Sequence, residues 1–155
     1  MAKLTIGNKA PKFTLTDQND HNVSLSDFAG QKLLIYFYPK ADTPGCTTQS
    51  CSVRDGLNEL QAHGVKAVGI SPDPPSKQKT FDDKYHLGFP LLSDVDHKIA
   101  ESYGAWGTKK MYGKEYQGII RSSFLVDEKG NIAQVSYKVS PKDTLPNALK
   151  VLGDQ

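Results

Sequence analysis

Two long apolar runs stand out in the alternation of hydrophobic and polar residues along the chain. The run KLLIYFY at residues 32–38 is branched and aromatic almost throughout, as is typical of a central strand buried on both faces. Residues 65–71, VKAVGIS, follow a glycine and predict a second buried strand. The pattern of residues 13–25, FTLTDQNDHNVSL, indicates two short strands around an Asn/Asp-rich turn, and FPLLSD at 89–94 indicates another.

A helix is expected to begin directly after Thr43. Threonine is a favoured N-cap residue, and Pro44 suits the first helical position. The apolar residues Val53, Leu57 and Leu60 then recur at spacings of four and three. This periodicity predicts one helix that continues through all of them.

Three further helices are expected. Residues 76–86 have the polar pattern of a surface helix, and residues 96–104, DHKIAESYG, form another segment with helical character. Near the end of the chain, Ser140 and Pro141 form a typical start signal. A second proline, Pro146, is expected to confine the regular part of that helix mainly to the residues after it.

The segment 118–137, GIIRSSFLVDEKGNIAQVSY, predicts a β-hairpin whose turn is at residues 127–130. Together, these elements predict an α/β fold with a mixed central β-sheet flanked by helices, arranged as a single domain over residues 1–155. Ligand sites in such sheets commonly lie beyond the carboxyl ends of the strands. The loop after residues 32–38 is therefore the first place to search for chemistry.

Composition and charge exclude several classes of protein. Nineteen basic and seventeen acidic residues give a net charge of +2, and the charges are scattered. This balance argues against a nucleic-acid-binding protein and against a polybasic membrane protein. The start of the chain, MAKLTIGNKAPKFTL, lacks the apolar core of a signal peptide, and no apolar run approaches the roughly 20 residues that span a bilayer. We therefore expect a cytoplasmic protein without a membrane association.

The chain has two cysteines, Cys46 and Cys51, which lie in the expected helix after Thr43. With Thr43 as N-cap, Cys46 is the third helical residue, where backbone N–H groups lack partners and the helix dipole favours an anion. This position stabilises a reactive thiolate. Asp42 would oppose it, so we expect a cation nearby, either Lys40 or Arg121 from the first arm of the hairpin.

Cys51 follows Cys46 by five positions in the expected helix. The Cα atoms of Cys46 and Cys51 are then about 8.6 Å apart, beyond the limit of about 7 Å for a disulfide. Either the pair never bridges or the start of the helix unwinds to let it. The second alternative fits oxidation of Cys46 to a sulfenic acid followed by attack from Cys51. The intervening Thr47, Thr48 and Ser50 are mediocre helix formers and would ease unwinding.

Two other interpretations of the cysteines remain on residue position alone. They could be inert buried thiols, since free cysteine is often buried. A zinc site is disfavoured, because zinc usually takes four ligands at recognisable spacings. The four histidines, at positions 21, 63, 86 and 97, show no short paired spacing and resemble surface or loop residues.

The stretch YFYPKADTPGCTTQSC at residues 36–51 resembles the active site of the peroxiredoxins, whose pattern is P-x-x-x-T-x-x-C. The second cysteine, five residues further on, is similar to the bacterioferritin comigratory protein or Q-type subfamily. The likeness extends over nearly the whole chain, through APKFTLTDQ, GISPD, FPLLSD and RSSFLVDEKGNI in the family's order. The spacing of the active-site pattern is highly specific, whereas each flanking piece is weak by itself.

The resemblance implies a thioredoxin-like fold and assigns five site residues. It implies that Cys46 is the peroxidatic cysteine and Cys51 the resolving one, that Thr43 orients the peroxide, that Pro39 shields the pocket from water, and that Arg121 holds the thiolate and polarises the peroxide. The implied activity is reduction of hydrogen peroxide and alkyl hydroperoxides through an intramolecular disulfide.

The same resemblance implies a thioredoxin-type reductant and no metal or organic cofactor, because sulfur itself takes both electrons. Resolution within one chain requires no dimer, so we expect a monomer. An alternative with the same chemistry is a peroxide-sensing redox relay that turns over little. The sequence does not separate this alternative from an enzyme.

Overall fold

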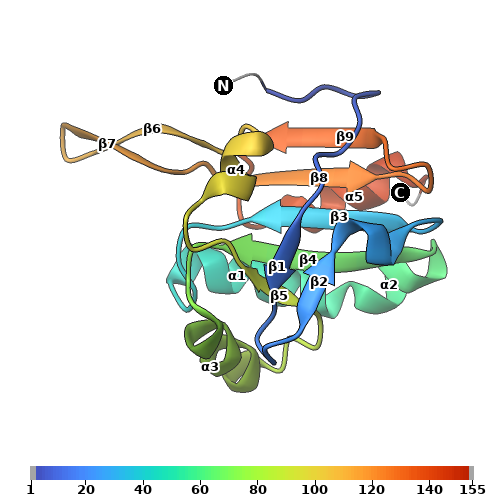
Figure 1. The fold of residues 1–155 in the computed structure, drawn as a ribbon, viewed down its shortest axis with the longest axis horizontal. Helices are drawn as coiled ribbons and strands as arrows, with labels where there is room; N and C mark the ends of the chain where they lie inside the picture. The colour runs from blue at the N-terminus through green and yellow to red at the C-terminus, as the bar shows by residue number, and fades with distance from the viewer. Residues whose placement is uncertain (1–2, 154–155) are drawn as a thin grey trace.

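The computed structural model describes residues 3–153 and contains a seven-stranded sheet with the strand order β2-β1-β5-β4-β3-β8-β9 (Figure 1). Its third strand in the chain, β3, pairs in parallel with β4 and antiparallel with β8, so the sheet is mixed, as predicted. The strands are β1 (Thr14–Thr16), β2 (Asn22–Ser24), β3 (Lys32–Phe37), β4 (Val65–Ser71), β5 (Leu91–Ser93), β8 (Ser122–Val126) and β9 (Ile132–Tyr137).

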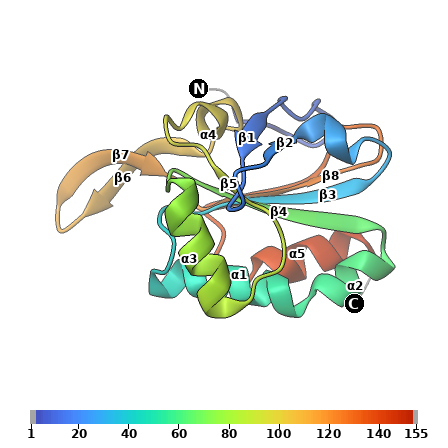
Figure 2. The same ribbon diagram turned by 60° about the horizontal axis from the view of Figure 1, so that its bottom comes forward.

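Helices cover the sheet on both faces. Figure 2 shows α1, α2 and α5 on one face and α4 on the other. Within residues 3–153, no helix has the length and apolar character needed to cross a membrane. The helical elements are η1 (a 3-10 helix, Leu25–Phe28), α1 (Pro44–Asp55), α2 (Leu57–Ala62), α3 (Pro75–Tyr85), α4 (Lys98–Ser102) and α5 (Thr144–Val151).

Strand β3 is buried on both faces, which confirms the interpretation of its apolar run. Alternate side chains point to opposite sides of a strand. Leu33, Ile35 and Phe37 accordingly belong to the core cluster on the α4 side. Leu34 and Tyr36 belong to the cluster under α1, α2 and α5. Strand β3, whose carboxyl end leads to the cysteines, therefore contributes side chains to both clusters.

The predicted continuous helix after Thr43 is wrong in one respect, because it is interrupted at Gly56. There α1 ends and α2 begins, with Gly56 at φ −96° and ψ 5°. A Cβ atom at this position would clash with the side chain of Leu145 in α5. Glycine therefore lets Leu145 pack closely against the break. The apolar periodicity through Val53 and Leu60 persists across the break, and both residues are fully buried.

Two other helices differ from the sequence prediction. Helix α3 is not merely a surface helix, because Gln78 and Phe81 are fully buried on its inner face. Helix α5 begins at Thr144, so Pro146 lies in its first turn instead of before it. Proline is tolerated there because the first N–H groups of a helix have no intrahelical partner.

A second hairpin, formed by β6 (Trp106–Met111) and β7 (Lys114–Ile119), was missed by the sequence analysis. It projects from the body of the protein at the edge where β3 ends (Figure 1). Residues 118–119, assigned above to the following hairpin, belong to β7. Most of this segment is exposed and polar, so it lacks the apolar alternation that identifies a strand.

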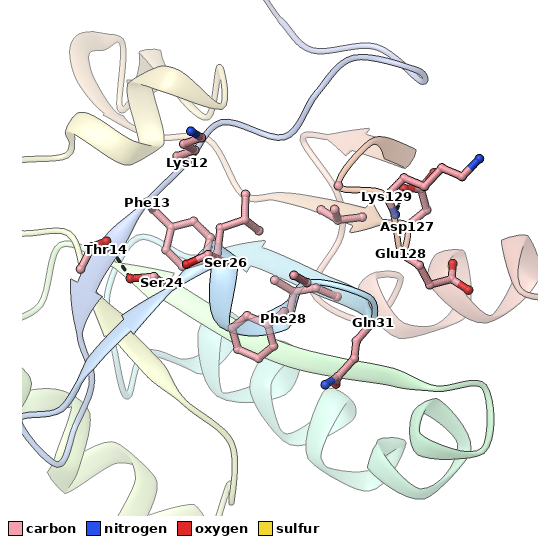
Figure 3. A pocket seen from close by; sticks show the side chains of 15 residues that line it. Lys12, Phe13, Thr14, Ser24, Ser26, Phe28, Gln31, Asp127, Glu128 and Lys129 are labelled. Carbon is pink, nitrogen blue, oxygen red and sulfur yellow. Dashed lines mark hydrogen bonds between the residues drawn. The ribbon is translucent and has the colours of Figure 1, made fainter.

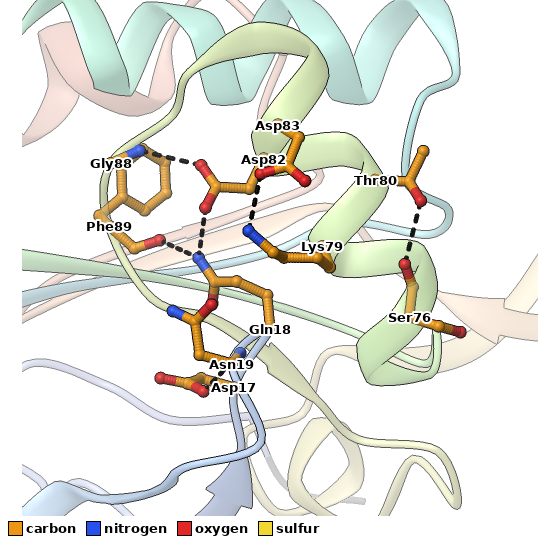
Figure 4. Close-up of polar contacts among 10 residues, drawn as sticks. All are labelled: Asp17, Gln18, Asn19, Ser76, Lys79, Thr80, Asp82, Asp83, Gly88 and Phe89. Atoms are coloured by element: carbon orange, nitrogen blue, oxygen red, sulfur yellow. Dashed lines mark hydrogen bonds and ion pairs between the residues drawn. The ribbon is translucent and has the colours of Figure 1, made fainter.

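A buried glutamine, Gln18, ties the β1–β2 turn to helix α3 and to the segment at the start of the neighbouring strand β5 (Figure 4). The Gln18 side-chain amide donates to the carbonyl of Phe89 at 2.9 Å and to Asp82 at 3.0 Å. Its oxygen accepts from the backbone N–H of Leu91 at 2.8 Å. Gln18 thereby supplies hydrogen bonds to backbone groups at the start of β5.

Replacing Gln18 with alanine is expected to lower the free energy of unfolding by about 2–3 kcal/mol, because a buried N–H and a buried carbonyl lose their partner. Urea denaturation measures this change. Gln61→Ala, the same substitution at an exposed side chain of α2, is the matched control and should change stability by less than about 0.5 kcal/mol. Equal effects of the two variants would contradict a bridging role for Gln18.

Candidate active site

The first turn of α1 holds Cys46 as the third helical residue, as predicted. Its side chain is buried, with 1% of its surface exposed. The first turn is closed by the backbone N–H of Thr47, which donates to the carbonyl of Thr43 at 2.8 Å. The N–H groups of Gly45 and Cys46 precede that bond, so they belong to the helix start, which favours negative charge.

Arg121 is the cation that contacts Cys46. One guanidinium nitrogen, Nη2, donates to the Cys46 sulfur at 3.5 Å. The backbone of Arg121 is fixed by the neighbouring strands: Ser122 pairs with Phe37 at the end of β3, and the N–H of Val139 donates to the Arg121 carbonyl at 2.9 Å. The prediction that Arg121 approaches from the hairpin is therefore confirmed, whereas the Lys40 side chain is exposed.

Gly45, beside Cys46, gives the guanidinium its space. A Cβ atom on Gly45 would lie 3.0 Å from Nη2 of Arg121 and 3.5 Å from Cγ of Pro141. A side chain here would press on the group that contacts the sulfur. The glycine of the TPGC sequence is thus part of the geometry of the site.

The carboxylate of Asp42 is bound by helix α3. Lys84 donates to it at 3.0 Å and the hydroxyl of Tyr85 donates at 3.0 Å. These hydrogen bonds, with that of Lys84 the larger cause, lower the pKa of the Asp42 carboxyl. The negative charge that we expected to oppose the Cys46 thiolate is therefore paired with a cation of its own.

Thr43 occupies the N-cap position of α1, with φ −92° and ψ 157°, but its side chain does not cap the helix. Its hydroxyl instead donates to the carbonyl of Lys40 at 2.8 Å. Thr43 is therefore the N-cap residue by position, as predicted, but its side chain does not form the capping hydrogen bond. The oxygen keeps lone pairs that can accept. Pro39 is half-buried just beyond the end of β3.

Cys51 lies on the same unbroken helix as Cys46, and both cysteines are free thiols. Cys51 is half-buried and lines a cavity of about 510 Å³ between α1, α2 and α5. The other lining residues include Asp55, Glu59 and Lys142. The structure thus agrees with the helical geometry, in which the two sulfurs stay apart while α1 is intact.

Gln49 is a site residue that the sequence analysis missed. Its oxygen accepts from Nη1 of Arg121 at 2.6 Å, and its amide donates to the hydroxyl of Thr144 in α5 at 2.9 Å. The side chain is fully buried. Gln49 follows Cys46 by three residues and so lies on the same helix face. That spacing was the available signal, but the partners lie far away in the chain.

Ser50 holds a second buried polar contact of α1. Its hydroxyl hydrogen-bonds to that of Tyr36 at 2.8 Å, and both side chains are fully buried. Burial raises the pKa of the Tyr36 hydroxyl above its ordinary range, so the tyrosine stays neutral. The aromatic residues 36–38 are core, as predicted.

The loop between β3 and α1 is braced by a buried chain of hydrogen bonds from Tyr38. Its hydroxyl donates to Gln78 at 2.5 Å, and the Gln78 amide donates to Ser71 at 2.8 Å. Ser71 donates to Asp73 at 2.7 Å, and the same Asp73 oxygen accepts from the N–H of Ala41 at 2.7 Å. The backbone that leads to Cys46 is therefore anchored to the end of β4.

Across residues 3–153, no three metal-ligating side chains of His, Cys, Asp or Glu cluster. A cavity of about 380 Å³ is lined by η1, Leu33 and the β8–β9 turn, at the opposite end of β3 from Cys46 (Figure 3). It contains no cysteine.

Comparison with known proteins identifies the family of the chain. Residues 6–135 match the AhpC/TSA family. The chain is 55% identical to the putative peroxiredoxin bcp of Haemophilus influenzae, covering 92% of each protein. It is 52% identical to peroxiredoxin Bcp of Escherichia coli K12, covering 97% of this chain and 98% of that protein.

The fold is also similar to that of solved peroxiredoxins. The bacterioferritin comigratory protein of Xanthomonas campestris superimposes with a TM-score of 0.85 at 34% identity, covering 91% of this chain and 90% of that one. This similarity confirms the predicted thioredoxin-like fold. From the family match and the close relatives, we conclude that the chain belongs to the AhpC/TSA family and is a peroxiredoxin of the Bcp type, a thiol peroxidase.

Proposed function

We propose that this peroxiredoxin reduces hydrogen peroxide and organic hydroperoxides at Cys46, resolves the product with Cys51, and is recycled by thioredoxin or a similar dithiol. The observation that carries the proposal is the 3.5 Å contact between Nη2 of Arg121 and the Cys46 sulfur at the start of α1. A fixed cation and a helix N-terminus both favour the thiolate over the thiol.

In the first step, the Cys46 thiolate attacks the terminal oxygen of the hydroperoxide. A sulfur–oxygen bond forms and the oxygen–oxygen bond breaks. Sulfur is oxidised to the sulfenic acid, and the departing alkoxide or hydroxide takes the electron pair and then a proton from solvent. Arg121 suits this step because a guanidinium stays charged and offers several donors in a fixed fork to the developing negative charge.

Thr43 would position the peroxide, and Pro39 would shield it from water. The Thr43 hydroxyl donates its hydrogen bond to the backbone carbonyl of Lys40, so its oxygen is suited to accept a hydrogen bond from the peroxide O–H. Holding the peroxide in line with the sulfur supplies the orientational part of the rate. The ring of Pro39, half-buried at the same sheet edge, limits access of water and offers no N–H of its own.

In the second step, Cys51 attacks the sulfenic acid, a disulfide forms and water leaves. The first part of α1 must open for this step, because the two residues are too far apart on an intact helix. Opening breaks the contacts of Gln49 with Arg121 and Thr144, and that of Ser50 with Tyr36. The dithiol reductant then restores both thiols by exchange.

The Xanthomonas campestris protein has alkyl peroxide reduction activity, which supports organic hydroperoxides as substrates of this chain. Because both cysteines belong to one chain, the cycle needs no partner subunit, and we propose a monomer. A cytoplasmic location fits the requirement for a reducing compartment.

Serine substitutions separate the roles of the two cysteines. Cys46→Ser should abolish peroxide reduction in a thioredoxin-coupled assay. Cys51→Ser should retain the first oxidation, with a sulfenic acid that dimedone traps, but lose recycling. If Cys51→Ser fails to oxidise, or Cys46→Ser still turns over, the assigned roles are wrong. A single oxidation without turnover in the wild type would favour the redox relay over the enzyme.

Replacing Arg121 with alanine should slow oxidation of Cys46 by about 100-fold to 1000-fold, because the developing oxyanion and the thiolate lose their fixed cation. Stopped-flow fluorescence with hydrogen peroxide measures the rate constant. Arg121→Lys, which keeps the charge but not the fork, should fall between the wild type and Arg121→Ala. Equal rates for wild type and Arg121→Ala would remove Arg121 from the mechanism.

Gln49→Leu should slow oxidation less than Arg121→Ala, by about 3-fold to 30-fold. The guanidinium keeps its charge and its contact with Cys46 but loses its hydrogen bond to Gln49. Gln49→Glu keeps an acceptor for Arg121 but adds a negative charge beside the Cys46 thiolate, so it should slow oxidation at least as much as Gln49→Leu. Equal rates for wild type and both variants would remove Gln49 from the positioning of Arg121. The same stopped-flow measurement distinguishes these outcomes.

A further inference from the structure

A cationic cavity lies at the base of the projecting hairpin. It has a volume of about 520 Å³. Four of its seven lining residues carry a positive charge and none carries a negative one; the lining consists of Thr108, Lys109, Lys110, Ile120, Arg121, Lys138 and Val139. Three chain segments contribute: the strand β6, the residues before β8 and those after β9.

The cavity adjoins the reactive sulfur through one shared residue. Arg121 lines the cavity and also contacts Cys46 through Nη2. Lys109 is half-buried, and its charge interacts with both Arg121 and Cys46; burial, followed by repulsion from Arg121, lowers the pKa of Lys109. A charged ligand bound by Lys109 would therefore lie close enough to interact electrostatically with Arg121 and Cys46.

The positive charge of the cavity is largely uncompensated. Lys110 lies 3.7 Å from Glu115, but both side chains are mostly exposed, so the pair is weak. In the described part of the chain, no carboxylate pairs with Lys109 or Lys138. Clustered cations without counter-charges attract anions and raise their local concentration.

The base of the hairpin is held firmly over this site. The N–H of Ile120 donates to the carbonyl of Ala105 at 2.8 Å. A Cβ atom on Gly107 would lie 2.9 Å from Cδ1 of Ile120, so glycine lets the hairpin pack against that side chain. Ile120 and Val139 give the cavity an apolar wall beside its lysines. This combination suits an organic group that carries a charge.

We propose that this cavity binds the anionic group of negatively charged organic hydroperoxides, and that Lys109 and Lys138 give the enzyme a preference for them over neutral ones. The proposal rests on Cys46 as the reacting thiol. The Cys46 thiolate attacks the terminal peroxide oxygen, the oxygen–oxygen bond breaks, and the alkoxide takes the electron pair and a proton from solvent. The thiolate and the charged substrate are both anions and repel each other. The positive charges of the two lysines offset this repulsion.

The test compares cumene hydroperoxide with its para-carboxylate derivative, which adds one negative charge to the same reacting group. The ratio of their oxidation rate constants for Cys46 isolates the effect of that charge. We expect the wild-type ratio to favour the carboxylate at low salt and to fall as NaCl rises from about 0.05 M to about 0.5 M. In the Lys109→Gln/Lys138→Gln variant, the ratio should fall by about 3-fold to 10-fold and lose its salt dependence.

Lys114→Gln is the matched control, because Lys114 is exposed on β7 of the same hairpin and does not line the cavity. It should leave the ratio unchanged. A wild-type ratio of one or less, or an equal ratio in the double lysine variant, would overturn the proposal. Failure of the underlying peroxidase site gives a different result, in which wild type oxidises with neither hydroperoxide or Cys46→Ser reacts as fast as wild type.

Discussion

The contact between the guanidinium of Arg121 and the sulfur of Cys46 is the interaction on which the rest of the site depends. The two residues are 75 positions apart in the chain. The pairing of Phe37 with Ser122 brings them together, since it sets Arg121 beside the end of the strand that leads to Cys46. A slip of one residue in this register would turn the buried residues of β8 to the wrong face. The register of β3 and β8 therefore determines both the packing of the sheet core and the contact between Arg121 and Cys46.

Helix α1 has two requirements that conflict. It must be folded to present Cys46 to Arg121, and it must open for Cys51 to reach the oxidised sulfur. The composition of its buried face reconciles them, because the buried residues are Cys46, Gln49, Ser50 and Val53, with one aliphatic side chain among them. Hydrogen bonds hold the first turns, and water can replace those bonds when the helix opens, so their net contribution is small. A face of leucines would have resisted opening by the loss of apolar burial.

Local sequence patterns predicted those parts of the site whose structure depends on residues close together in the chain. The strand 32–38, the helix start after Thr43 and the position of Cys46 in the first turn follow from spacing alone. Arg121 needed the resemblance to known proteins as well, because many strands carry an arginine on their surface. The bond between Gln49 and Arg121 and the hairpin 106–119 were missed. The first joins residues 72 positions apart, and the second lacks an apolar face, so neither leaves a local pattern.

Helix α1 must be closed in the reduced protein and open in the disulfide form. Hydrogen–deuterium exchange of the amides at residues 47–55 tests this directly, in the reduced protein and in the protein whose Cys46–Cys51 bond has been confirmed by mass spectrometry. We expect exchange at least about 10-fold faster in the disulfide form, while β3 keeps its protection. Equal protection of these amides in the two forms would contradict the account, because the sulfurs would then have joined without opening the helix.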